Sequence, residues 1–369
     1  MQTYTAFVFD TSERKFKPAK IRVENGIISK ITKASAPKVP VYIIPGLIDV
    51  HTHGRCGYDI MASPKDELSK MSLEYAKVGT TSLFPTVMTA PLDNVTATIS
   101  NVVGAKPRGA RFLGVHVEGP YISKEKRGCH DASYIRMPDK GEMTDIVNKI
   151  SPLKAHFTVA PENCPSGLVA ALSTISTVGI GHTGTDFKTA MSAVYDGAVS
   201  FTHTFNAMTQ MTQREAGVVG AALYSGAYAE FIVDGFHVSP EVISIAYQAK
   251  KKQGDKFVLI TDSIPQAGLP DGRYEMNGIE FTLSGKSAKR DDGTIVGSAT
   301  DLYTAVKNLS AFADISFEEA LICATKNPAE MVGIYDKVGS IDVGKYADFI
   351  VLDQNRNITS VYVGGERII

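Results

Sequence analysis

Apolar residues along this chain occur mainly in short runs of β type, and longer stretches with helical spacing of apolar positions separate them. Eight such runs stand in the middle of the chain. Their approximate bounds are residues 47–51, 81–84, 112–118, 155–160, 178–182, 199–203, 230–234 and 257–262. Eight alternating β and α units predict an α/β fold of the TIM type, a (β/α)8 barrel.

The two ends of the chain differ from its middle, because their β-type runs are not followed by helical stretches. Between residues 5 and 43 the runs are short, and Asn25-Gly26 between two of them predicts a hairpin. Residues 346–352 and 360–365 have the same character. We therefore expect a small β-sandwich domain built from residues 1–44 and 341–369, and a barrel domain built from residues 45–340.

Composition and charge narrow the function classes. Of the 369 residues, 44% are hydrophobic and 21% are charged, as in ordinary globular proteins. The chain has 38 basic and 39 acidic residues, and this balance gives no electrostatic reason to expect nucleic acid or a membrane as partner. A small-molecule partner fits better. Because the chain shows neither a signal segment nor a membrane span, we expect it in the cytoplasm, with its four cysteines reduced.

Histidine or acidic residues that are candidates for metal binding or proton transfer end five of the eight predicted strands. In a (β/α)8 barrel the C-terminal strand ends form the active-site face, so residues that end different strands meet there. An apolar strand has little intrinsic reason to end in a charged or metal-binding residue. The side chains concerned are His51 with His53 after the first strand, Glu118 after the third, and His182, His203 and Asp262 after the fifth, sixth and eighth.

These residue types predict a metal-dependent hydrolase. His51 and His53 are two positions apart, so both side chains leave the same face and can converge on one ion. Glu118, His182 and His203 make a three-ligand site with a position left for water. Imidazole and carboxylate ligands suit zinc, iron(II) or cobalt, and His51 with His53 would allow a second ion.

Asp262 is the candidate proton carrier, because a carboxylate beside metal-bound water can take its proton and pass it to the leaving group. Each of these residues also has an ordinary alternative. A single histidine often serves as a loop or core residue, Glu118 could be a solvated loop residue, and Asp262 could itself bind metal or cap the following turn. His116 shares the face of Glu118 but lies one pleat deeper, so we expect it to support the site from the core.

Several longer motifs carry a family resemblance. Residues 45–54 (PGLIDVHTHG), 115–120 (VHVEGP), 181–183 (GHT) and 261–262 (TD) resemble the amidohydrolase superfamily. More narrowly, the chain resembles the N-acetylglucosamine-6-phosphate deacetylase family. That match rests on residues 126–130 (KRGCH), 202–208 (THTFNAM), 214–220 (REAGVVG) and 233–237 (VDGFH). The motifs follow in order over nearly the whole chain, so together they are highly specific.

The resemblance implies roles for individual residues. It implies that Glu118, His182 and His203 bind metal and that Asp262 is the acid and base for hydrolysis of an acetamide. It also implies an amino-sugar phosphate as substrate, and these substrate contacts: Cys129, His130, Asn206, Ala207, Arg214, Asp234, His237, Ile295, Val296 and Gly297. The planar fork of Arg214 suits phosphate oxygens. In this family such an arginine can come from a neighbouring subunit, which predicts a homodimer.

Two features of the sequence differ from at least some members of the family. Some members lack both histidines at the positions of His51 and His53 and use one ion, so one or two ions are expected here. Cys129 stands where a small residue such as alanine is usual, which leaves the fine shape of the substrate site open. Rival interpretations are a deacetylase of N-acetylgalactosamine 6-phosphate, a cyclic-amide hydrolase, an amidohydrolase-like assembly protein without catalysis, and a barrel that only binds a phosphosugar.

Overall fold

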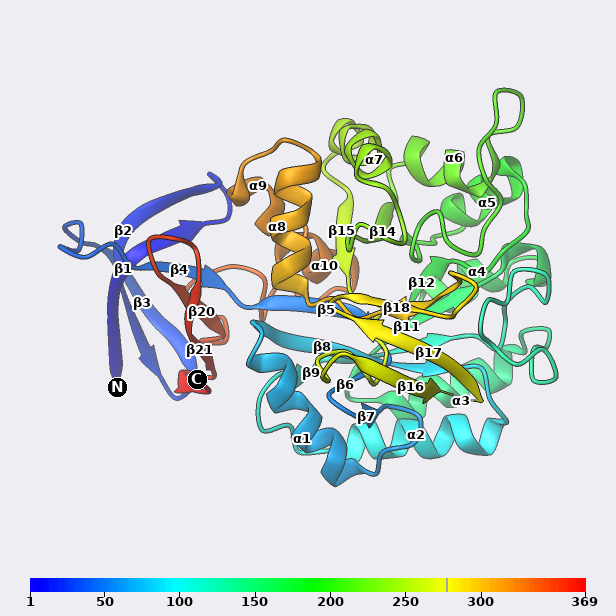
Figure 1. Cartoon of the computed structure of the whole chain (residues 1–369), viewed down its shortest axis with the longest axis horizontal. Coiled ribbons are helices and arrows are strands. Elements are labelled where there is room, and N and C mark those ends of the chain that lie inside the picture. The colour runs from blue at the N-terminus through cyan, green and yellow to red at the C-terminus, as the bar shows by residue number, and fades with distance from the viewer. Residues whose placement is uncertain (277) are drawn as a thin grey trace.

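The computed structural model describes residues 1–276 and 278–369 and shows a barrel beside a smaller sheet (Figure 1). Eight parallel strands form the barrel, and each coincides with one of the predicted runs. They are β5 (Leu47–Thr52), β8 (Thr80–Met88), β10 (Gly114–Glu118), β11 (Lys154–Val159), β12 (Thr177–Ile180), β13 (Ser200–Phe201), β14 (Tyr228–Ile232) and β15 (Phe257–Ile260). A short strand, β9 (Arg111–Phe112), pairs with the side of β8.

The first and last barrel strands meet at their C-terminal ends. Neighbouring strands are hydrogen-bonded in the order β15-β14-β13-β12-β11-β10-β8-β5. Thr52 and Ser263 then form a parallel bridge between the two ends of this order. Beside the bridge, the backbone N–H of Asp262 donates to the carbonyl of His51 at 2.9 Å. The prediction of a (β/α)8 barrel is therefore confirmed, and two predicted site residues are joined directly by the closure.

Helices cover the outside of the barrel (Figure 1). They are α1 (Lys65–Ala76), α2 (Leu92–Gly104), α3 (Lys140–Ile150), α4 (Leu168–Ser173), α5 (Phe187–Tyr195), α6 (Gly217–Tyr224), α7 (Pro240–Lys252), α8 (Leu302–Phe312), α9 (Phe317–Ile322) and α10 (Lys326–Met331), with a 3-10 turn, η1 (Pro161–Asn163). Within the described ranges, no helix combines the length and the apolar character needed to cross a membrane.

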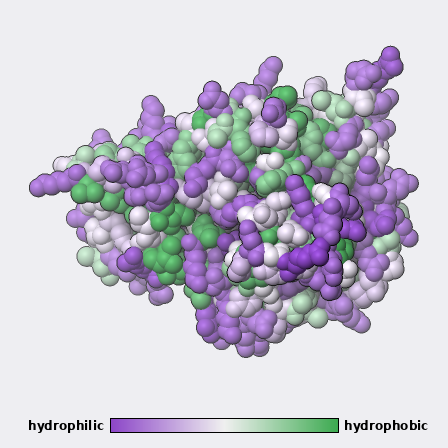
Figure 2. Space-filling model, in the orientation of Figure 1, coloured by the Kyte–Doolittle hydropathy of each residue, from purple (hydrophilic) through white to green (hydrophobic). Residues whose placement is uncertain are grey.

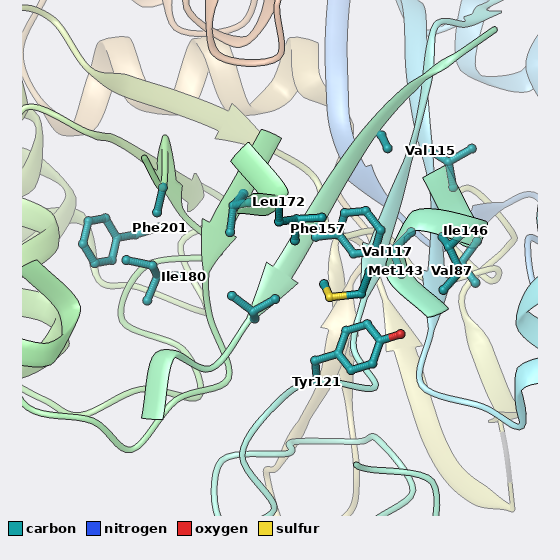
Figure 3. Packing of buried hydrophobic residues seen from close by; sticks show 14 of the residues in the cluster. Val87, Val115, Val117, Tyr121, Met143, Ile146, Phe157, Leu172, Ile180 and Phe201 are labelled. Atoms are coloured by element: carbon teal, nitrogen blue, oxygen red, sulfur yellow. The ribbon is translucent and has the colours of Figure 1, made fainter. Parts of the chain in front are cut away.

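Strand β10 shows how one strand serves both the core and the site. Its valines, Val115 and Val117, are buried in the apolar layer that also holds Met143 of α3 (Figure 3). Because side chains of a strand alternate between its two faces, His116 and Glu118 point into the barrel instead. Apolar packing against the helices therefore aims the carboxylate of Glu118 at the interior of the mouth.

The two ends of the chain form a second sheet, in the order β22-β21-β20-β4-β1-β2-β3. Its strands are β1 (Gln2–Asp10), β2 (Lys15–Glu24), β3 (Ile27–Lys33), β4 (Tyr42–Pro45), β20 (Phe349–Leu352), β21 (Ile358–Val363) and β22 (Glu366–Arg367). The predicted hairpin at Asn25-Gly26 is confirmed, because both residues have positive φ and β2 pairs with β3 in antiparallel fashion. In Figure 2, apolar residues gather over this sheet and along its junction with the barrel. The division into residues 1–44 with 341–369 and residues 45–340 stays a prediction.

A four-stranded antiparallel sheet, which the apolar pattern did not predict, is inserted after β15. It contains β16 (Gly272–Met276), β17 (Ile279–Ser284), β18 (Ser287–Lys289) and β19 (Ile295–Ser298), and it lies in yellow across the front of the barrel in Figure 1. A smaller ribbon of β6 (Gly54–Arg55) and β7 (Tyr58–Asp59) follows His53. The inserted sheet brings Ile295, Val296 and Gly297 to the barrel mouth.

Candidate metal centre and active site

The predicted metal and proton residues all lie at or just beyond C-terminal strand ends. His51 lies in β5 and Glu118 ends β10, while His182, His203 and Asp262 each lie two residues beyond the last residue of their strands. The last three residues have φ values of 47°, 31° and 49°, in the left-handed region. Such backbone costs roughly 1–3 kcal/mol per residue and persists where the surroundings enforce it, as they do at functional sites. The chain therefore turns sharply at these three positions and directs their side chains into the mouth.

Three side chains from three strands converge on one point. The Nε2 atoms of His182 and His203 lie 3.1 Å and 3.2 Å from Glu118 Oε1, and 2.9 Å from each other. All three residues are buried. A His2Glu arrangement is one of the common ligand sets of catalytic zinc sites. The structure thus brings together the three residues that the sequence predicted as the main metal ligands.

A second group lies on another side of Glu118 and contacts both of its carboxylate oxygens. His53 Nε2 is 3.0 Å from Asp262 Oδ1 and 3.3 Å from Glu118 Oε2. His51 Nε2 is 3.4 Å from the same Asp262 oxygen and 3.3 Å from Glu118 Oε1. One ligand atom each from His51, His53 and Asp262 makes a compact group, and Glu118, His130 and His182 make another. Glu118 therefore stands between two groups of ligand type.

The hydrogen bond on the far side of His182 fixes which ring nitrogen is free. Its Nδ1 lies 2.7 Å from the carbonyl oxygen of Lys126, which can only accept a hydrogen bond. In the neutral imidazole the proton is therefore on Nδ1, and Nε2 presents a lone pair toward Glu118 and His203. A metal-ligating histidine typically uses this arrangement, in which its second nitrogen donates to a carbonyl or carboxylate.

The electrostatics of the cluster favour a cation. Burial raises the pKa of Glu118, but the charge of His51 and close contacts with three other histidines hold that pKa well below its usual range. Burial lowers the pKa of His53, but its contacts with Asp262 and Glu118 raise it to about 10. The two buried carboxylates thus draw positive charge onto the neighbouring rings. A divalent cation would supply the same charge.

The donor set also passes a direct test of fit to a metal. Nε2 of His51, which faces Glu118 and Asp262, is buried without a hydrogen-bond partner among the described residues. Buried polar atoms are normally satisfied, so this nitrogen needs a partner at the cluster. Burial lowers the pKa of His182 to about 4, which keeps that ring neutral and able to donate its lone pair to a metal. Nitrogen and carboxylate ligands at this spacing fit zinc and related divalent ions.

A cavity of about 240 Å³ opens above this cluster. Thirteen of the predicted site residues line it: His53, Glu118, Cys129, His130, His182, His203, Asn206, Ala207, His237, Asp262, Ile295, Val296 and Gly297. Larger hollows near Arg111 and Arg136, of about 610 and 630 Å³, contain neither of the two ligand-type groups. The chemistry is therefore concentrated in the smaller cavity.

Two cavity histidines are oriented by their neighbours. His237 Nδ1 lies 2.7 Å from Asp234 Oδ2, and that carboxylate also accepts the backbone N–H groups of Phe236 and His237. His237 therefore donates through Nδ1 and offers Nε2 as an acceptor. His130 Nδ1 accepts from the backbone N–H of Thr89 at 3.4 Å, so its Nε2 carries the proton and can donate. One histidine is thus set to accept a hydrogen bond and the other to donate one.

Three predicted site residues lie outside the cavity wall. His51 is fully buried beneath it, and Asp234 lies behind His237. Arg214 is exposed on the segment between β13 and α6, where the structure gives it no contact with the cavity. Sequence reasoning also missed four residues of the wall: Met88, Gly128, Ile264 and Met276. Met88 is the last residue of β8, so the expectation that C-terminal strand ends form the active-site face could have identified it. Met276 comes from the inserted sheet and carried no signal.

Comparison with known proteins agrees with this geometry. Residues 42–368 match the model of the amidohydrolase family. The chain is 32% identical to N-acetylglucosamine-6-phosphate deacetylase of Vibrio furnissii, over 94% of this chain and 89% of that protein. It is also 30% identical to N-acetylgalactosamine-6-phosphate deacetylase of Escherichia coli O157:H7, over 96% of each chain.

A solved structure gives the same result for the fold. It is a point mutant of N-acetyl-D-glucosamine-6-phosphate deacetylase from Mycobacterium smegmatis in complex with N-acetyl-D-glucosamine 6-phosphate. It matches with a TM-score of 0.89 and 25% identity, over 100% of this chain and 99% of that one. The chain belongs to the amidohydrolase family and, within it, to the group of N-acetylglucosamine-6-phosphate deacetylases.

Proposed function

We propose that this enzyme hydrolyses the acetamide of N-acetyl-D-glucosamine 6-phosphate and releases acetate and D-glucosamine 6-phosphate, a step in amino-sugar breakdown. The observation that carries the proposal is the position of Asp262, which lies in the cavity wall 3.0 Å from His53 and beside the cluster around Glu118. A carboxylate at this point faces both a candidate metal position and the space for a substrate. The family membership then supplies the substrate class.

Three residues of the cavity have separate roles in the proposed amide hydrolysis. Asp262 takes a proton from the attacking water and returns it to the nitrogen of the departing amine. His130 donates from Nε2 to the oxygen that becomes negative as the carbonyl is attacked, an effect worth roughly 3–4 kcal/mol for a well-placed donor. His237 accepts a hydrogen bond from a sugar hydroxyl, since Asp234 holds its proton on the other nitrogen.

The metal remains part of the proposal. Glu118, His182 and His203 would hold one divalent ion, and His51 with His53 would hold a second where two bind. Zinc is the first choice because the ligands are imidazole and carboxylate, and iron(II) or cobalt would also suit them. A bound divalent ion supplies a Lewis acid, which polarises the carbonyl and lowers the pKa of a neighbouring water toward about 7.

We also propose that the enzyme is a homodimer. None of the described residues that line the cavity is a lysine or arginine, although the substrate carries a phosphate. Arg214 stands exposed on the segment that leads into α6, and the large side chains of Met211, on the same segment, and Tyr224, at the end of α6, are exposed as well. Exposed large apolar side chains are typical of protein interfaces. A second copy that covers this surface would place its Arg214 at the cavity of the first.

The test of the proposed function is acetate release from a purified, metal-defined enzyme. N-acetyl-D-glucosamine 6-phosphate and N-acetyl-D-galactosamine 6-phosphate are compared in parallel, because the relative from Escherichia coli acts on the second sugar by its name. We expect higher kcat/KM for the first substrate. A higher kcat/KM for N-acetyl-D-galactosamine 6-phosphate would mean that the same mechanism serves that epimer instead. Acetate release from neither sugar phosphate would contradict the proposed function.

A further inference from the structure

The barrel interior beneath the candidate metal ligands is polar, whereas barrels of this type are usually filled with branched apolar side chains. His51, His116 and His156 form a chain of ring contacts there, with centroids 4.4 Å and 5.1 Å apart. All three are fully buried. Polar side chains are expensive to bury unless they are hydrogen-bonded, and both nitrogens of His51 and Nε2 of His156 have no such partner among the described residues.

Glu230 in β14 adds a carboxylate to this buried interior. It has no exposed surface, and its Oε1 accepts a hydrogen bond from Ser200 Oγ at 2.8 Å. The same oxygen lies 3.5 Å from His156 Nε2. Its second oxygen, Oε2, lies 4.0 Å from His51 Nδ1 and has no hydrogen-bond partner among the described residues. A buried carboxylate oxygen of this kind requires a donor.

The surroundings of Glu230 keep room for this carboxylate network. At Gly179 in β12, an added Cβ would come within 2.9 Å of Ser200 Oγ and 3.2 Å of His156 Nε2. Both atoms face Glu230. A larger residue at this position would push them away, so the absence of a side chain at Gly179 is part of the arrangement.

His51, in turn, needs an acceptor for the proton on Nδ1. Its Nε2 faces Glu118 and Asp262 at 3.3 Å and 3.4 Å, and its Nδ1 faces Glu230. A neutral imidazole carries one proton, so a histidine that binds metal through Nε2 must carry that proton on Nδ1. At His182 the carbonyl of Lys126 accepts this proton. At His51 the carboxylate oxygen facing Nδ1 belongs to Glu230.

We propose that Glu230 is a positioning residue for His51: its carboxylate accepts the Nδ1–H, directly or through one enclosed water. This contact fixes the tautomer and ring orientation in which Nε2 of His51 points toward Glu118 and Asp262. A separation of 4.0 Å suits either a small side-chain adjustment or one bridging water. Glu230 touches neither substrate nor reacting atoms. The inference rests on the proposed function only in requiring that His51 binds a metal.

The first test measures zinc affinity by chelator competition on Glu230→Leu and Glu230→Gln, with stoichiometry by elemental analysis. Loss of such a partner typically weakens metal binding by about 10- to 100-fold, which we expect for Glu230→Leu. Glu230→Gln keeps an acceptor oxygen and should lose roughly tenfold or less. Ser200→Ala is the matched control, because it removes a contact to Glu230 Oε1 and leaves Oε2 facing His51. Its zinc affinity should stay within about threefold of wild type.

The second test reads the tautomer of His51 in the wild-type, zinc-loaded enzyme, and so does not depend on the folding of a Glu230 variant. Two-dimensional proton–nitrogen NMR on histidine labelled with nitrogen-15 should show the proton on Nδ1, with His51→Gln providing the assignment. In Glu230→Leu this signal should broaden through exchange. A proton on Nε2 of His51 in the wild type, or unchanged zinc affinity in Glu230→Leu, would overturn the proposal.

The two proposals fail in different ways. If zinc-loaded wild-type enzyme releases no acetate from either sugar phosphate, the proposed function fails, and the zinc affinities still decide the role of Glu230. If the wild type is active and Glu230→Leu retains both its zinc affinity and the tautomer of His51, only the role of Glu230 fails.

Discussion

His182 and His203 face one another across the barrel mouth, with Nε2 atoms 2.9 Å apart and Glu118 Oε1 within 3.2 Å of both. Three atoms at this spacing bind a cation much better than they pair among themselves, since two imidazoles share only one hydrogen bond. We therefore expect Glu118→Gln to lose the bound metal and to lower kcat/KM by about 100-fold or more. Elemental analysis and acetate release measure the two effects.

The matched control for this change is His116→Gln. His116 lies on the same face of β10, is hydrogen-bonded to Thr86 and Thr158, and does not line the cavity. This variant should lose stability and keep the wild-type metal stoichiometry. Full metal content in Glu118→Gln would show that the cluster around Glu118 is not the metal site.

Asp262→Asn separates proton transfer from metal binding. Asp262 has a φ of 49°, and asparagine tolerates this left-handed backbone better than most residues. The amide cannot take a proton from water, so kcat should fall by roughly 10²–10⁴-fold. Metal stoichiometry and the unfolding midpoint should stay close to wild type. Retention of full activity would rule out Asp262 as the proton carrier.

Much of the fold could be predicted because the barrel strands are apolar runs of the expected length. The site could be predicted for a related reason: His51, Glu118, His182, His203 and Asp262 are polar residues that end apolar strands. Parallel strands in a barrel bring such ends together regardless of the conformation of the loops. The convergence of three of these side chains on one point, at about 3 Å, follows from that topology.

The inserted sheet and the buried network could not be predicted in the same way. Strands β16 to β19 alternate polar and apolar residues over short lengths, as many surface hairpins do, so nothing in their pattern shows that they cover the mouth. Glu230 lies within an apolar run that has the pattern of an ordinary strand. Its place beside His51 depends on contacts between strands far apart in sequence, which only the structure provides.

Arg214 should act across the interface of the proposed dimer, and mixed dimers test this directly. Arg214→Ala subunits have an intact Asp262, and Asp262→Asn subunits have an intact Arg214. If the arginine comes from the partner, a mixed dimer has one complete site, in the Arg214→Ala subunit. At a substrate concentration far below the KM of Arg214→Ala, where both preparations are nearly inactive, mixing them should therefore restore activity to about a quarter of the wild type after random exchange.

The controls for this experiment use the parent variants alone. Each preparation is taken through the same exchange procedure without the other, and neither should gain activity. Arg214→Ala by itself should raise KM far more than it lowers kcat, because it removes a substrate contact rather than a reacting group. No recovery in mixed dimers, shown to form by mass spectrometry, would place Arg214 in its own subunit's site or outside the reaction.

Lys250 holds the C-terminal end of α6 from a buried position in α7. Its ammonium group donates to the carbonyls of Ala222, Ser225 and Ala227 at 2.7 Å, 2.9 Å and 2.6 Å, and the residue has no exposed surface. Lys250→Met would leave three carbonyls without this donor and should lower the free energy of unfolding by roughly 2–4 kcal/mol. Lys252→Met, an exposed change on the same helix, should stay within about 0.5 kcal/mol of wild type in denaturant unfolding.

Lys250 also predicts how stability depends on pH. Burial, with a smaller effect of the charge on Lys256, lowers the pKa of Lys250 to about 7 from the ordinary lysine value of 10.5. Between these values the unfolded chain keeps a proton that the folded chain has released, so stability rises with pH. The free energy of unfolding of the wild type, relative to Lys250→Met, should be flat below pH 7 and increase from pH 7 to 10. A constant difference across this range would mean that the three carbonyls keep the ammonium charged in the folded state.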